Sequence, residues 1–145
     1  MYQKQNRMKI KNLHYIVFFI ILVGCRNNDN KNIVINDNNI FINEIGNYTF
    51  RDYNIIIKQF KDGSFIYGIF GGIRNECLYQ QNLEQTFNNY SKWTFYIDEK
   101  DRIWFYNSDR DEITVFSYKN NKIIYEYHKN KLPPIPKKLE EFINS

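Results

Sequence analysis

Four short runs of strand-forming residues, separated by polar turns, follow one another between residues 93 and 127. The runs are WTFYI (93–97), RIWFYN (102–107), EITVFSY (112–118) and KIIYEY (122–127). Each run is rich in the aromatic and β-branched residues that favour strands, and the segments between them are rich in Asp, Asn and Ser, which favour turns. Such closely spaced strands predict an antiparallel meander.

Composition extends this prediction to the rest of the chain. The sequence contains no alanine, the strongest helix former, and aromatic residues make up 18% of it. From residue 33 onward, short apolar runs are repeatedly broken by turn residues. These features predict one mainly β domain over 33–145, built as an antiparallel meander, a small sandwich or a partial barrel.

Two hairpins are expected before the meander. One would join 33–35 to 40–42 across NDNN, and the other would join 53–60 to 64–70 across KDG. Gly63 in the second turn is placed to take a positive φ.

Two helices are expected as well. Residues 78–90 form the one internal candidate helix, in which Leu83 and Phe87 have i, i+4 spacing. The prolines after residue 132 exclude a central strand, and Pro136 is suited to open a short C-terminal helix. That helix would cover one face or one edge of a sheet with three apolar side chains: Leu139, Phe142 and Ile143.

The N-terminal segment has the three-part pattern of a secretory signal peptide. A basic region up to Lys11 is followed by the apolar run 15–24 and then by the polar segment RNNDNKN (26–32). The apolar run is about half the length of roughly 20 residues that a membrane-spanning helix needs. Met1 and Met8 both remain candidate start residues.

The end of the apolar run, Leu22-Val23-Gly24-Cys25, resembles the lipobox of bacterial lipoproteins. The resemblance implies cleavage before Cys25, diacylglycerol on its sulfur and acylation of the new amine, so that several acyl chains, palmitate among them, hold the protein on a membrane. Val23 is larger than the Ser or Ala usual there, and the resemblance covers only the first 25 residues. An uncleaved signal anchor and a soluble secreted protein remain the alternatives.

This reading divides the chain into a signal peptide (1–24), a lipidated cysteine with a flexible tether (25–32) and the β domain (33–145). It places the domain in the cell envelope. Because Arg26 rather than Asp follows the cysteine, resemblance to the sorting rule of enteric-type lipoproteins favours the outer membrane in a host that has one.

The charge balance argues against a nucleic-acid partner. The net charge of +4 comes entirely from the first 25 residues, since residues 26–145 carry 16 basic and 16 acidic side chains. A nucleic-acid-binding domain needs a basic surface, and this composition does not supply one.

Few residues are suited to catalysis or to binding a cofactor or a metal. Outside the signal peptide His128 is the one histidine, and Cys77 lacks an intramolecular partner if Cys25 is lipidated. We expect His128 to lie exposed at a strand end and Cys77 to be a buried thiol. The acidic side chains of 98–101 and 109–112 would lie in turns at opposite ends of one strand, so they form no common site. We therefore expect no catalytic residues, no metal and no cofactor.

An aromatic face of the meander is the candidate binding surface. Side chains alternate along a strand, so both faces of the meander carry aromatic residues, and one face is richer in tyrosine and tryptophan than the other. The residues assigned to this surface are Tyr96, Trp104, Tyr106 and Tyr118. Whether a helix or a second sheet covers this face is left open.

The function that follows is a non-catalytic lipoprotein that binds a protein partner in the cell envelope. In type, size and tethering the chain resembles small envelope immunity lipoproteins, which implies an inhibitor or immunity protein against an envelope-directed toxin. The alternative is a structural or cell-wall-binding lipoprotein in which Trp104 stacks on a sugar. An envelope enzyme that uses His128 is the less favoured third hypothesis.

Overall fold

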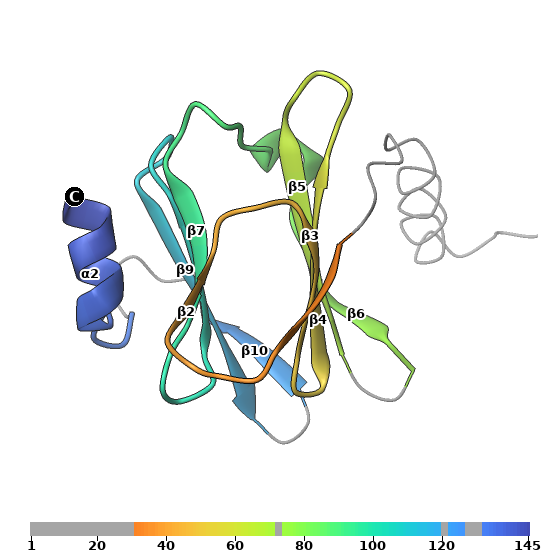
Figure 1. The fold of residues 1–145 in the computed structure, drawn as a ribbon, viewed down its shortest axis with the longest axis vertical. Coiled ribbons are helices and arrows are strands. Elements are labelled where there is room, and N and C mark those ends of the chain that lie inside the picture. Colours follow the sequence, from red (N-terminus) through yellow and green to blue (C-terminus); the bar gives the residue numbers. More distant parts are fainter. Residues whose placement is uncertain (1–30, 72–73, 120–121, 127–131) are drawn as a thin grey trace, which may run out of the picture.

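The computed structural model of the chain describes residues 31–71, 74–119, 122–126 and 132–145. Within these residues, ten strands form two five-stranded sheets that pack face to face, with one α-helix outside the second sheet (Figure 1). The mainly β fold with a sandwich architecture is therefore confirmed. The predicted signal peptide, Cys25 and His128 lie outside the described residues.

Sheet A contains, in spatial order, β1 (Asn32–Ile35), β3 (Gly46–Phe50), β4 (Tyr53–Gln59), β5 (Phe65–Gly71) and β6 (Glu76–Gln80). The strands β3 to β6 are antiparallel neighbours, whereas β1 pairs in parallel with β3 at the edge. The predicted hairpin across KDG is confirmed as β4 and β5. Gly63 has a φ of +89°, the left-handed conformation that favours glycine. Asn32, assigned to the tether, already belongs to β1.

Sheet B contains, in spatial order, β10 (Lys122–Glu126), β9 (Glu112–Lys119), β8 (Ile103–Asn107), β7 (Trp93–Ile97) and β2 (Ile40–Ile42). Its four consecutive strands are the predicted meander, with each strand end within one residue of the expected position. The fifth strand, β2, pairs antiparallel with β7 at the edge.

The predicted first hairpin is wrong, because β1 and β2 belong to different sheets. The NDNN segment between them crosses from sheet A to sheet B. Asn39 has a φ of +63°, and its backbone N–H donates to the carbonyl of Ile97 at 2.7 Å. This contact directs the chain onto β7 instead of back along β1.

The predicted helix over 78–90 is also wrong. The chain continues as β6 to Gln80, makes the short 3₁₀ turn η1 (Leu83–Gln85), and then pairs Phe87 with Phe65 through two backbone hydrogen bonds of 2.6 and 3.2 Å. Asparagine explains the difference, since its side chain competes for backbone N–H groups that a helix would use. Asn88 accepts in this way from the N–H groups of Tyr90 and Ser91, whereas Asn82 caps the 3₁₀ turn by accepting from the N–H of Glu84 at 3.1 Å.

The C-terminal helix α2 (Lys137–Asn144) begins directly after Pro136, as predicted. Leu139 is fully buried, and Phe142 and Ile143 pack beside it on the outer face of sheet B. Figure 1 shows α2 lying against that sheet on the side away from sheet A. No helix in the described part of the chain has the length and apolar character needed to cross a bilayer.

Candidate functional site

The aromatic face that the sequence suggested as a binding surface is buried. Tyr96, Trp104 and Tyr106 are only 1%, 0% and 6% exposed, because α2 and the segment before it pack on them. The side chain of Tyr118 lies outside the described residues. The question left open by the sequence is thus answered for these three residues: α2 covers them, and a sugar cannot stack on the enclosed ring of Trp104.

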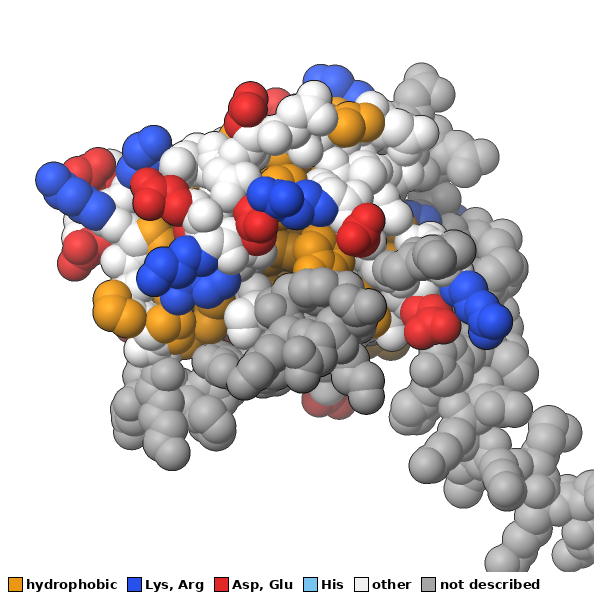
Figure 2. All heavy atoms as spheres, turned by 90° about the horizontal axis from the view of Figure 1, so that it is seen from below, with side chains coloured by type: hydrophobic (Ala, Val, Ile, Leu, Met, Phe, Trp, Pro, Cys, Tyr) orange, Lys and Arg blue, Asp and Glu red, His pale blue; other side chains and the backbone are white. Residues whose placement is uncertain are grey.

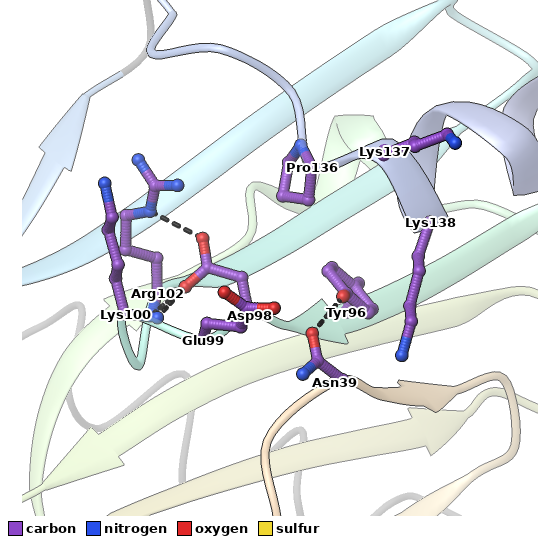
Figure 3. Close-up of a pocket in the computed structure, with 9 residues that line it drawn as sticks. All are labelled: Asn39, Tyr96, Asp98, Glu99, Lys100, Arg102, Pro136, Lys137 and Lys138. Atoms are coloured by element: carbon purple, nitrogen blue, oxygen red, sulfur yellow. Dashed lines mark hydrogen bonds and ion pairs between the residues drawn. The ribbon is translucent and has the colours of Figure 1, made fainter.

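A pocket of about 350 Å³ lies at the border of this covered face (Figure 3). It forms where the β7–β8 turn, the residue before β2 and the start of α2 meet. Its lining residues are Asn39, Tyr96, Asp98, Glu99, Lys100, Arg102, Pro136, Lys137 and Lys138.

The buried acid of this pocket, Asp98, holds the β7–β8 turn together. Its carboxylate accepts hydrogen bonds from the backbone N–H groups of Lys100 and Arg102 at 2.8 and 3.0 Å. It also accepts from Arg102 Nε at 2.6 Å and from Trp104 Nε1 at 2.8 Å. With four donors around it, this carboxylate is engaged in structure and is not available as a general base or a metal ligand.

Two further hydrogen bonds, both partly buried, tie the sheet crossing to β7 and the same turn. The Tyr96 hydroxyl donates to Asn39 Oδ1 at 2.6 Å, and Asn38 Nδ2 donates to the Asp98 carbonyl at 3.0 Å. Burial raises the pKa of Tyr96, and the negative charges of Asp98 and Glu99 raise it further. The phenol therefore keeps its proton at neutral pH and remains a donor.

The lining side chains of the pocket that remain exposed to solvent include charged residues of the β7–β8 turn and of the start of α2. Figure 3 shows the Lys138 side chain extending toward Asn39, whereas Lys137 points away from the cavity. Lys137 makes only a long, exposed ion pair of 3.8 Å with Glu141. The pocket therefore lies where hydrogen bonds join the β7–β8 turn to the sheet crossing, and charged side chains line its rim.

Of the other residues considered for chemistry, the structure describes Cys77 and the two acidic turns, but not His128. Cys77 was expected to be buried but is only half-buried; burial raises the pKa of its thiol, so it stays protonated at neutral pH. The two acidic turns lie at opposite ends of β8, as expected. No group of three or more His, Cys, Asp or Glu side chains among the described residues is arranged to hold a metal.

The most exposed aromatic residue of the described chain is Tyr90, in the connection between β6 and β7, with its side chain 100% exposed. Its backbone is held, since Asn88 Oδ1 accepts from the N–H groups of Tyr90 and Ser91 at 2.8 and 3.2 Å. The Ser91 hydroxyl donates to the Asn88 carbonyl at 2.8 Å. Three residues before Tyr90, Phe87 is 1% exposed in the core.

The β8–β9 turn lies against both ends of this connection. Ser108 exchanges hydrogen bonds with the backbone of Lys92, and the Arg110 guanidinium donates to the carbonyl of Glu84 at 2.8 Å. Together these segments form one exposed surface, which we call the Tyr90 surface. It consists of Leu83, Glu84, Tyr90, Asp109, Arg110 and Asp111, with Leu83 44% exposed.

Sequence reasoning missed Tyr90 because it assigned this segment to a helix. The useful signal was the asparagine two residues before the tyrosine, which favours a local side-chain-to-backbone turn over a helix. Comparisons of the chain with protein-family models, with curated proteins and with solved structures found no match.

Proposed function

We propose that this chain is a lipid-anchored, non-catalytic protein of the bacterial cell envelope whose β domain binds a protein partner. The observation that carries the proposal is a fully exposed Tyr90 on a connection whose backbone is held by hydrogen bonds. Tyrosine supplies a large contact area at low entropic cost, and it is enriched among the residues that dominate protein interfaces.

A protein partner fits this surface better than a small ligand. A fully exposed side chain projects from the molecule, so it is suited to enter a pocket of another protein. Leu83 adds a second exposed apolar side chain in the same connection, and the charged residues Glu84, Asp109, Arg110 and Asp111 of the Tyr90 surface are exposed as well. An apolar anchor inside a charged rim is the usual anatomy of a specific protein interface.

The lipid anchor is supported by the N-terminal sequence and by where the domain begins. The carbonyl of Lys31 accepts from the backbone N–H of Asn47 at 3.0 Å, so the described domain starts within six residues of Cys25. A fully extended chain of that length reaches at most about 20 Å. An acylated Cys25 would therefore hold the domain close to the membrane surface, with Arg26 favouring the outer membrane where one exists.

Within this class we favour an inhibitor or immunity protein against an envelope-directed toxin. Its small size, its tether and the balanced charge of residues 26–145 suit a protein that acts by occupying a partner at a membrane surface.

The anchor is tested by the intact mass of the protein purified from its host. We expect a mass that corresponds to cleavage before Cys25 plus acyl chains, and we expect the Cys25→Ser variant to lack them. An unmodified full-length mass for the native protein would contradict the lipid anchor.

The binding function is tested by replacing Tyr90 with alanine in the full chain. Loss of a central aromatic anchor weakens an interface by about 2 kcal/mol or more, so we expect the dissociation constant of the purified partner to rise at least about 30-fold. Val34→Ala is the matched control, because Val34 is 67% exposed but lies on β1, outside the Tyr90 surface. Equal affinities of wild-type and Tyr90→Ala proteins would refute the proposed contact.

A further inference from the structure

We infer that a second pocket, which shares no residue with the Tyr90 surface, binds a neutral sugar unit. It has a volume of about 280 Å³ and lies at the end of the sandwich that is uppermost in Figure 1. The β2–β3 connection, the β4–β5 hairpin and the connection that enters β7 form it. Small-molecule sites usually have volumes of roughly 300–1,000 Å³, so this pocket suits one sugar ring better than a larger ligand.

Amide and carboxylate side chains line the pocket toward solvent. They belong to Asn43, Glu44, Gln59 and Asn89. Asn43, Glu44 and Asn89 are exposed, and their side chains make no hydrogen bond or ion pair with another described residue. Gln59 Nε2 donates to the Gly63 carbonyl at 3.3 Å, which leaves Oε1 as an acceptor. Amides both donate and accept, as sugar hydroxyls do, and a carboxylate accepts from hydroxyls.

The indole of Trp93 adds a buried donor to this pocket. Trp93 is only 6% exposed, and its ring lies 5.7 Å from that of Phe65 and 5.0 Å from that of Phe87. Its Nε1–H donates to no described residue, but it is not enclosed, because the one enclosed side-chain polar atom without a partner in the described chain is Asn47 Oδ1. The exposed part of the indole therefore includes the N–H, and the space that Trp93 borders is the pocket. Since a buried indole N–H normally has a partner, a ligand hydroxyl is the expected acceptor.

The charges of the lining favour a neutral ligand. None of the described residues that line the pocket is basic, and Glu44 is acidic, so an anion would be repelled. An ammonium group would meet one carboxylate but would face the indole N–H, which is a donor. The other end of the sandwich differs, since Figure 2 shows basic and acidic side chains side by side there. A sugar ring fits both kinds of surface, with its hydroxyls on the polar groups and its C–H groups against Ile45 and Phe65.

The pocket lies where the chain enters the domain from Cys25. Asn43, Glu44 and Ile45 lead directly into β3, and the N–H of Asn47 in that strand donates to the carbonyl of Lys31 at 3.0 Å. If Cys25 is acylated as proposed, the pocket is held near the membrane surface. The headgroup of a neutral glycolipid and a sugar of the wall glycan are the two sources of ligand there, and the test includes both.

The test follows the two indole N–H signals of the isotope-labelled full-length protein in detergent by NMR while sugars are added. The probes are glucosylglycerol, a glycolipid headgroup, and N-acetylglucosamine, a unit of wall glycan. We expect at least one probe to shift the Trp93 signal with a dissociation constant of about 1 mM, which is usual for a ligand of this size. The Trp104 signal should stay in place, because its N–H already donates to Asp98. Trp93→Phe assigns the signals by removing one of them.

The sugar that shifts the Trp93 signal identifies the source of the ligand. Glucuronate, which is negatively charged, should leave that signal unchanged at the same concentrations. A Trp93 signal that moves with neither neutral sugar would overturn the inference. Equal shifts of both indole signals, or a shift with glucuronate as large as with the neutral sugars, would do so as well.

Asn89→Ala tests whether the ligand contacts the pocket lining. Loss of one hydrogen bond should raise the dissociation constant about fivefold, and the fold should be kept because Asn89 is exposed. Asn36→Ala is the matched control, since Asn36 is an exposed asparagine just after β1, outside the pocket, and its affinity should stay within about twofold of wild type. Equal affinities of Asn89→Ala and wild type would contradict the proposed contact.

Tyr90→Ala separates this inference from the proposed protein-binding function, on which it does not depend. Tyr90 does not line the pocket, so the variant should bind the sugar within about twofold of wild type even where it has lost a protein partner. Loss of sugar binding in Tyr90→Ala would place the ligand on the Tyr90 surface and overturn the pocket as its site.

Discussion

Replacing Trp104 with alanine is expected to lower the free energy of unfolding by about 4 kcal/mol, the usual cost of truncating a large buried aromatic residue. The indole has no exposed surface and packs beneath α2. Its Nε1–H donates to Asp98 at 2.8 Å, and the Arg102 guanidinium lies 5.0 Å from its ring centre. The substitution thus leaves a cavity under the helix and removes a donor from the buried carboxylate.

Urea unfolding of the purified chain measures this loss, and Trp104→Phe separates its two causes. Phenylalanine keeps most of the apolar volume but has no N–H, so that variant should lose only about 1–3 kcal/mol. If Trp104→Ala unfolds at nearly the same urea concentration as wild type, α2 does not cover this face in solution.

Replacing Phe87 with alanine should also lower the free energy of unfolding by about 4 kcal/mol. The Phe87 ring lies among four aromatic rings of the core, at centroid distances of 5.0 to 6.3 Å; these belong to Phe65, Tyr67, Trp93 and Phe105. Because Phe87 precedes Tyr90 by three residues, its loss should also loosen the connection that presents Tyr90.

Hydrogen exchange distinguishes these two effects of Phe87→Ala. In wild type the N–H groups of Tyr90 and Ser91 donate to Asn88, and Phe87→Ala should speed their exchange more than global destabilisation explains. Phe87→Leu, which refills much of the cavity, is the control and should restore protection. Unchanged exchange in Phe87→Ala would show that the core does not hold the connection in place.

The parts of the fold that the sequence predicted well depend on neighbours in the chain. The meander in sheet B and the hairpin of β4 and β5 join adjacent strands through short turns, so local turn chemistry and alternation were enough. The pairing of β2 with β7 joins residues more than fifty positions apart, and no local pattern indicates it. β3 was missed although GNYTF alternates polar with apolar residues as a half-buried strand does, because it begins with Gly and Asn, which favour turns.

The candidate site was harder to predict because exposure is decided by tertiary packing. Alternation correctly placed Tyr96, Trp104 and Tyr106 on one face, but it could not tell that the apolar side of α2 would cover them. For Tyr90 the prediction failed because a helix was expected over 78–90, where the chain forms β6, a 3₁₀ turn and an extended segment. The backbone bridge between Phe87 and Phe65 holds the chain in an extended path, and the apolar spacing alone resembled that of a helix.

The short strand β2 has a protective consequence for the whole molecule. It contains only three residues, yet it occupies the free edge of β7, whose sequence WTFYI is aromatic and carries no charge. An open edge of this composition is a template on which other chains can add strands and aggregate. Ile40–Ile42 thus keep a sheet rich in aromatic residues from growing beyond the folded domain.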